Sequence, residues 1–128
     1  MARMKATGTI AVKSWDEKTW DGRPYTEVEG RKLTEAHVQF TYGGEISGVG
    51  SCRYLMYYGE DVAWTTALEE ITTDDGTLVL RHVGAYRSAV EGATEIVDGT
   101  GKFLNARGAV TVDWAEDGSG TYTLEYEV

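Results

Sequence analysis

The chain has 128 residues, of which 21 are acidic and 12 are basic, and its formal charge is −9. This length and a hydrophobic fraction of 41% predict a single domain over residues 1–128 that buries roughly two-thirds of its unfolded surface. An acidic surface repels phosphate backbones and anionic headgroups, so it argues against nucleic acid and membranes as partners. The simpler interpretation is that the charge keeps a small protein soluble.

The cysteine count and the start of the chain bear on the cellular compartment. Cys52 is the only cysteine, so the chain forms no internal disulfide, and the histidines lie 15 and 30 residues away in sequence. We therefore interpret Cys52 as a small core residue. The first residues lack a charged region followed by a long apolar run, and no window resembles a membrane span. We expect a cytoplasmic protein.

The first predicted strand covers residues 5–15, where Ile10, Val12 and Ser14 share one face. Residues 15–30 then read as a long connection, which holds the only proline and has no clear period. Long connections in small β proteins often cover an opening. The aromatic side chains in this one either form a lid over a pocket or seal the end of the core; they are Trp15, Trp20 and Tyr25.

Residues 32–42 alternate cleanly between two faces, which predicts a second strand. The apolar face carries Ala36, Val38, Phe40 and Tyr42. His37 lies on the opposite, polar face, and no second set of ligands stands at metal-binding spacing, so we expect no metal site there. The pair Gly43-Gly44 predicts a turn.

The register of the next strand, residues 45–58, has two solutions. A two-residue turn at Gly43-Gly44 directs inward Val49, Arg53 and Leu55. A bulged turn directs inward Ile46, Cys52, Tyr54 and Met56. The second set is more apolar and is therefore preferred. Glycines at 48 and 50 suit the bend that a barrel needs at a corner.

Residues 61–86 predict a hairpin, because an Asp-Gly turn joins two apolar stretches. If Thr72 pairs with Thr77, Glu69 and His82 become diagonal neighbours on one face. A shift of one residue would separate the two side chains, since side chains alternate between faces with period two.

The rest of the chain adds a strand over 88–97 and a hairpin formed by 107–114 and 121–128. Residues 98–108 predict a loop with one short helical turn that packs Phe103 and Leu104 inward. The fold class is therefore all-β, with about eight long strands. Long antiparallel strands in up-and-down order close best into a single eight-stranded β-barrel, and a two-sheet sandwich is the second choice.

Several segments together resemble a bacterial protein family of unknown function whose members form barrels like that of allene oxide cyclase. The segments that carry the resemblance are KATGTIAVKSWDE, RKLTEAHVQFTYGGEISGVGSCRYLMYY, ALEEIT, GTLVLRHVGAY, DGTGKFLNARG and TYTLEYE. The resemblance implies an eight-stranded antiparallel barrel and, more distantly, a likeness to the barrel-type cyclases of polyketide pathways, the Diels–Alderase-like enzymes. It also implies functional positions at Glu69 and His82, although Glu70 and Arg81 beside them depart from the family pattern.

Three functions fit such a barrel. The first is a cyclase or isomerase that uses no metal and no cofactor, with Glu69 and His82 as its acid and base. The second is a carrier of a small lipophilic molecule, and the third is a structural module, for instance a homodimer. The residues expected to line the interior are Tyr54, Met56, Leu80, Tyr86, Trp114 and Tyr122.

Overall fold

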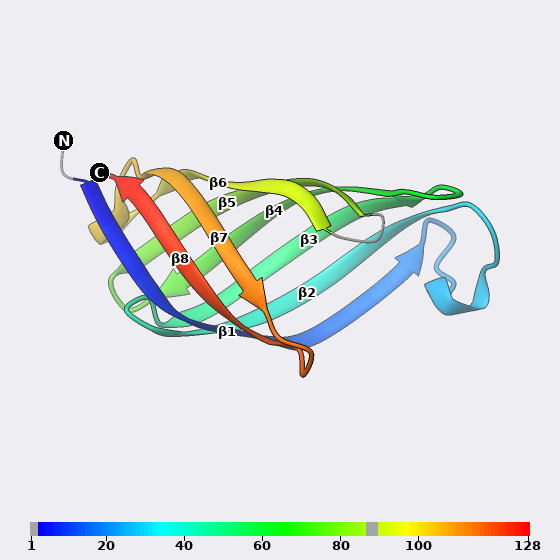
Figure 1. The fold of residues 1–128 in the computed structure, drawn as a ribbon, viewed down its shortest axis with the longest axis horizontal. Coiled ribbons are helices and arrows are strands. Elements are labelled where there is room, and N and C mark those ends of the chain that lie inside the picture. Colours follow the sequence, from blue (N-terminus) through cyan, green and yellow to red (C-terminus); the bar gives the residue numbers. More distant parts are fainter. Residues whose placement is uncertain (1–2, 87–89) are drawn as a thin grey trace.

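The computed structural model describes residues 3–86 and 90–128, without the side chains at 86 and 90–92. Its strands form one closed antiparallel barrel in which each strand pairs with the next and the last pairs with the first (Figure 1). The strands are β1 Arg3–Thr19, β2 Lys32–Gly44, β3 Gly48–Tyr58, β4 Ala63–Thr73, β5 Gly76–Tyr86, β6 Val90–Gly99, β7 Arg107–Trp114 and β8 Ser119–Glu127. The predicted all-β, eight-stranded up-and-down barrel is confirmed.

The β4–β5 hairpin has the predicted register. Thr72 pairs with Thr77, and Glu69 pairs with Leu80. Asp74 and Asp75 form a two-residue turn between the strands. The alternation of apolar residues and the turn sequence specify the same pairing, so Glu69 and His82 do share the inner face.

Strand β1 is longer than predicted, because a β-bulge between Val12 and Ser14 lets it continue to Thr19. The bulge reverses the alternation, so Glu17 pairs with the buried Ala36 and is itself buried. Val12 precedes the bulge and is 43% exposed, because it lies beyond the last pair between β1 and β8. The prediction that residues 15–19 belong to a connection was therefore wrong. The connection is shorter, covers residues 20–31 and contains the 3₁₀ helix η1, Tyr25–Glu27.

The turn between β2 and β3 lies later than predicted. Gly43 and Gly44 remain in β2, where they pair with Thr9 and Gly8 of β1. The turn is formed by residues 45–47 instead. This longer turn buries the more apolar of the two alternative sets, namely Ile46, Cys52, Tyr54 and Met56.

The connection between β6 and β7 contains the second 3₁₀ helix, η2, Gly101–Phe103. Phe103 is buried and packs edge-on against Tyr126 of β8. Leu104 is 60% exposed, so the expectation that it packs inward was wrong. A single helical turn can direct only one of two adjacent side chains to the core. Neither helix of the described chain has the length or apolar character needed to cross a membrane.

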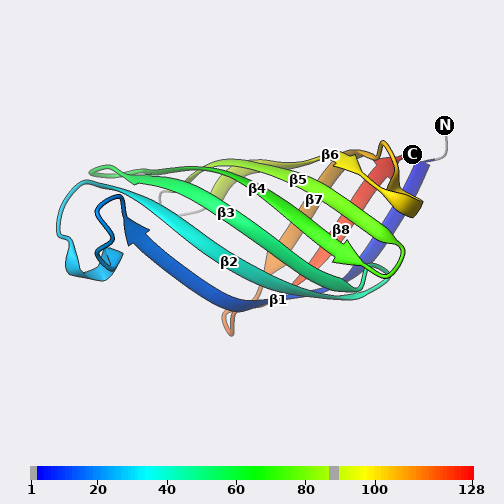
Figure 2. The ribbon, with the colours of Figure 1, turned by 180° about the vertical axis from the view of Figure 1, so that it is seen from behind.

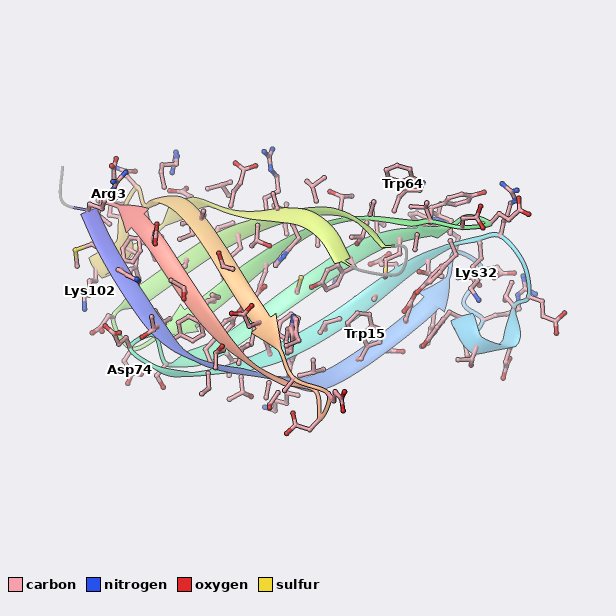
Figure 3. All side chains as sticks on the ribbon, viewed as in Figure 1. Arg3, Trp15, Lys32, Trp64, Asp74 and Lys102 are labelled. Carbon is pink, nitrogen blue, oxygen red and sulfur yellow. The ribbon has the colours of Figure 1, made fainter. Side chains whose placement is uncertain are left out.

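The wall of the barrel is complete at one end only. Strand β1 pairs with β8 only as far as Ala11 and continues beside β2 alone. Strands β6 and β7 share three pairs, the last of which joins Thr94 to Val110. Strands β1 to β5 therefore extend beyond the β7–β8 hairpin, as the two opposite views show (Figures 1 and 2). Trp15 and Lys32 lie toward this longer end, and Asp74 and Lys102 lie at the other (Figure 3).

Candidate functional site

A cavity of about 350 Å³ lies inside the barrel. Its apolar lining includes Ile10, Phe40, Tyr54, Leu80, Val112 and Trp114. Ala93 and Thr111, the first positions beyond the last β6–β7 pair, also line it. The cavity therefore opens where these two strands separate. Its volume is at the small end of the usual range for ligand sites, which is roughly 300–1,000 Å³.

Glu69 and His82 form a hydrogen bond at the wall of this cavity. His82 Nε2 lies 2.8 Å from Glu69 Oε1. The Glu69 side chain is fully buried, whereas 20% of the His82 side chain is exposed. His82 is therefore the member of the pair that a bound molecule would meet first.

Tyr42 completes the surroundings of the Glu69 carboxylate. Its hydroxyl donates a hydrogen bond to Glu69 Oε2, so each carboxylate oxygen has its own partner. Burial and the neighbouring negative charge of Glu69 raise the pKa of Tyr42 above its usual value. Tyr42 therefore stays protonated and remains a donor to the carboxylate.

Thr94 connects the pair to the cavity. Its Oγ1 lies 3.0 Å from Nδ1 of His82, and the side chain lines the cavity. Because an ionised carboxylate only accepts hydrogen bonds, we assign the imidazole proton to Nε2 and let Nδ1 accept from the Thr94 hydroxyl. A continuous hydrogen-bonded chain thus runs from Tyr42 through Glu69 and His82 to Thr94.

Gly50 provides the space that the carboxylate occupies. A Cβ atom at this position would lie 2.2 Å from Oε2 of Glu69 and 2.9 Å from Cε1 of Tyr42. Only glycine leaves room for a carboxylate against the strand here. This contact gives a physical reason for one of the two glycines in β3 beyond the expected bend.

Cys52 brings a third possible metal ligand close to the pair. One ligand atom each from Cys52, Glu69 and His82 lie within 4.8 Å of one another. However, burial and the charge of Glu69 raise the pKa of the thiol to about 12. The 2.8 Å between Nε2 and Oε1 is also shorter than the roughly 3.3 Å between two ligands on a tetrahedral zinc. Glu69 and His82 are therefore placed for hydrogen bonding, and a metal ion could bind here only if their hydrogen bond broke.

The remaining residues expected to line the interior are divided between the cavity and the core. Tyr54, Leu80 and Trp114 line the cavity. Met56 is buried but is not part of its lining. Tyr122 lies in the core, where its hydroxyl accepts from the backbone N–H of Ile46 and lies 2.8 Å from two carbonyl oxygens. The side chain of Tyr86 lies outside the described residues.

A second buried carboxylate, Glu17, lies in the part of β1 that follows the bulge. It accepts hydrogen bonds from Thr34 and Tyr58, both at 2.6 Å, and from Nε1 of Trp15 at 3.0 Å. Trp15 in turn stacks on Tyr54 with ring centroids 5.6 Å apart. Glu17 thereby holds the Trp15 side chain against Tyr54, which lines the cavity. The sequence pattern does not predict it, because residues 15–30 read as a connection whereas β1 continues to Thr19.

A larger hollow of about 630 Å³ lies against the outer wall of the barrel. Leu55 and Leu68 line it and are themselves 42% and 60% exposed. It is a shallow groove over mostly apolar surface. Glu69 borders it as well, but the Glu69 carboxylate bonds to His82 and Tyr42 on the inner face. The inner cavity is therefore the candidate site.

Comparison with known proteins agrees with this architecture. A crystal structure from Shewanella oneidensis MR-1, described as a DUF3224 protein of unknown function, has 21% sequence identity and a TM-score of 0.78. The match covers 98% of each chain, and at this identity it shows a shared fold. No curated protein matches the chain. The profile of DUF3224, a family described as proteins of unknown function, matches residues 6–126, so the chain belongs to that family.

Proposed function

We propose that the barrel binds a small, largely apolar molecule in its inner cavity and moves a proton on it, as a cofactor-independent isomerase or cyclase. One observation carries the proposal: the Glu69–His82 pair, 2.8 Å apart, lies at the wall of a cavity that is lined by apolar and aromatic side chains and a few threonines. A buried carboxylate is costly unless it is well bonded, and a few polar groups that converge at one wall of a cavity are typical of a ligand site.

His82 is the proton acceptor in this proposal. Among the described residues its Nδ1 bonds only to the Thr94 hydroxyl, which itself lines the cavity, and a bound molecule takes the place of that hydroxyl to reach Nδ1. Glu69, bonded to Nε2, holds the ring in place and stabilises the imidazolium that forms. The apolar walls keep the molecule folded and exclude water, which supplies the remaining rate enhancement.

The order carboxylate, imidazole, hydroxyl also occurs in hydrolase triads, but it does not favour hydrolysis here. Thr94 lies within β6 and pairs with His82 on one side and Val110 on the other. Backbone N–H groups near it are committed to two ladders and are poor donors for an oxyanion hole. Proton transfer needs no such donors on the backbone.

Carriage of a small lipophilic molecule without chemistry is the second candidate. One observation favours it: both oxygens of Glu69 and both nitrogens of His82 already have partners within the protein. In that case the cluster fixes the inner wall, and the cavity alone selects the ligand.

A cavity-filling variant tests whether the interior is the binding site. Val112 is half-buried and lines the cavity, so Val112→Trp should occupy it. Leu68→Trp, on the exposed outer wall, is the matched control. The measurement is mass spectrometry of small molecules released from each purified protein by organic solvent.

We expect a released compound from the wild type and from Leu68→Trp, and none from Val112→Trp. The compound is then incubated with fresh protein, and an isomer formed only in its presence supports catalysis. Recovery of unchanged compound supports carriage. Equal recovery from all three proteins would contradict binding inside the barrel.

A further inference from the structure

Thr65 carries a buried hydroxyl that lacks a hydrogen bond. Its Oγ1 is inaccessible to solvent and has no partner among the residues that the structure describes. The residue is 6% exposed and lies on the inner face of β4, two positions before Ala67 and four before Glu69. Leaving a buried hydroxyl unpaired is unfavourable, so such a group calls for an explanation.

Other buried threonines of this barrel differ from Thr65. Thr34, which is fully buried, donates to Oε2 of Glu17 at 2.6 Å. Thr19 bonds to Asp21 and to the carbonyl oxygen of Arg23. Threonine hydroxyls at the inner face are therefore normally satisfied from within the protein. Thr65 is the exception, and it is the one of the three that lines the cavity.

The Thr65 hydroxyl is closed off from the cavity in this conformation, but the residue lines the cavity, so a rotation about χ1 can turn the hydroxyl toward a bound molecule. Its partner on β5 is Gly84, which has no side chain to cover it, and Gly84 also lines the cavity. Its partner on β3 is Met56, whose thioether is a weak acceptor. His82 lies two residues before Gly84 on β5 and also faces inward. Thr65 and the Glu69–His82 pair therefore lie on the same wall.

We propose that Thr65 is a substrate-binding residue that donates a hydrogen bond to the carbonyl oxygen of a small, otherwise apolar ketone. This inference rests on the proposed function and names its substrate class. The hydroxyl hydrogen needs an acceptor, and a carbonyl oxygen is the acceptor that also activates a neighbouring C–H bond. When the ketone oxygen accepts a hydrogen bond from Thr65, the neighbouring α-carbon of the ketone is directed toward His82.

The chemistry that follows is enolisation. The α-C–H bond breaks, its proton moves to Nδ1 of His82, and its electron pair moves into the new C=C bond of the enolate. The carbonyl π pair moves onto oxygen, where the Thr65 hydroxyl stabilises the negative charge. When the ketone carries a β,γ double bond, the enolate extends over it, and return of the proton to the γ-carbon gives the conjugated isomer. No oxidant or other reactant is consumed.

Acetophenone and ethylbenzene provide a direct test, because they share a skeleton and differ by the carbonyl oxygen. Their dissociation constants are measured by calorimetry for the wild type, Thr65→Val and Thr34→Val. We expect the wild type to bind the ketone roughly tenfold more tightly than the hydrocarbon. Thr65→Val should bind both equally and should melt no lower than the wild type. Thr34→Val should melt lower, because it breaks a bond to Glu17, but should keep the preference for the ketone.

Three results separate this inference from the proposed function. Equal binding of ketone and hydrocarbon by the wild type would overturn the role of Thr65 and leave the apolar cavity intact. Tighter binding of phenylethanol than of acetophenone, lost in Thr65→Val, would overturn the assignment of a ketone. Failure of both probes to bind the wild type, together with no released compound, would overturn both proposals.

Discussion

His82 Nε2 lies 2.8 Å from Oε1 of Glu69, which is its diagonal neighbour across the β4–β5 ladder. The contact depends on the register of one hairpin, since Glu69 pairs with Leu80 and His82 pairs with Ala67. Its environment depends on residues distant in sequence, because Tyr42 supplies the donor for the other oxygen. The site is therefore a product of barrel closure rather than of one motif.

Removal of the Glu69 carboxylate should destabilise the barrel strongly. Glu69→Ala leaves His82 and Tyr42 without their shared acceptor, and we expect a loss of about 3 kcal/mol in the free energy of unfolding. Glu70→Ala, on the exposed face of the same strand, should change it by less than about 0.5 kcal/mol. Urea denaturation measures both. Equal effects would mean that the hydrogen bonds of Glu69 to His82 and Tyr42 do not stabilise the folded barrel.

Gly50→Ala should damage the site without touching a polar group. The new methyl group would overlap Oε2 of Glu69, so the carboxylate must move from its bond with Tyr42. We expect a loss of about 1–3 kcal/mol and a shifted NMR resonance for His82. Ser51→Ala, at the next, exposed position, is the control. An unchanged His82 resonance in Gly50→Ala would show that the contact is unimportant.

Stability should fall at alkaline pH, and Cys52 should contribute to the fall. Burial raises the pKa of its thiol from 9.0 to about 12. Between these values the unfolded chain loses the proton while the folded chain keeps it, so the free energy of unfolding falls as pH rises. The slope is at most about 1.4 kcal/mol per pH unit for one group. Cys52→Ala should flatten the curve above pH 9.0, whereas an unchanged slope would contradict this assignment.

The raised pKa of Tyr42 should add to the same loss at higher pH. Its unfolded value is 10.0, so its contribution is fully present below that pH and is lost as pH rises above it. Tyr42→Phe should remove this component while leaving that of Cys52. Denaturation curves of both variants from neutral to strongly alkaline pH distinguish the two groups.

Glu17 should control the conformation of Trp15. Glu17→Gln keeps the size of the side chain but replaces one acceptor oxygen with a donor amide, so bonds from Trp15, Thr34 and Tyr58 cannot all persist. We expect lower stability and a changed near-UV circular dichroism spectrum. Asp16→Asn, on the exposed side of β1, should leave the spectrum unchanged. A change in both variants would indicate a general effect of charge on the strand.

The sequence allowed the barrel and the Glu69–His82 pair to be predicted because each depends on local signals. The clean alternation in β2, the Asp-Gly turn after β4 and the apolar residues of β5 all predict antiparallel strands with one buried face. The preferred face of β3 was confirmed for a similar reason, since Ile46, Cys52, Tyr54 and Met56 form the more apolar of two sets.

Other parts of the site could not be predicted from local signals. The bulge after Val12 carries no distinctive residue, and it changed the inward set of β1 to include Glu17. Thr94 and Thr65 look like ordinary strand threonines. Their roles depend on the register of neighbouring strands, which places Thr94 against His82 and leaves the Thr65 hydroxyl without a partner among the described residues.

Deuterium uptake at the methyl group of acetophenone in heavy water tests the central claim most directly. The claim is that the Glu69–His82 pair moves a proton on a molecule bound in the cavity. It predicts exchange faster than in buffer for the wild type and for Glu70→Gln, and a loss of about 100-fold or more in His82→Phe and Glu69→Gln. Exchange in the wild type at the rate of buffer, or equally fast exchange in all four proteins, would contradict the claim.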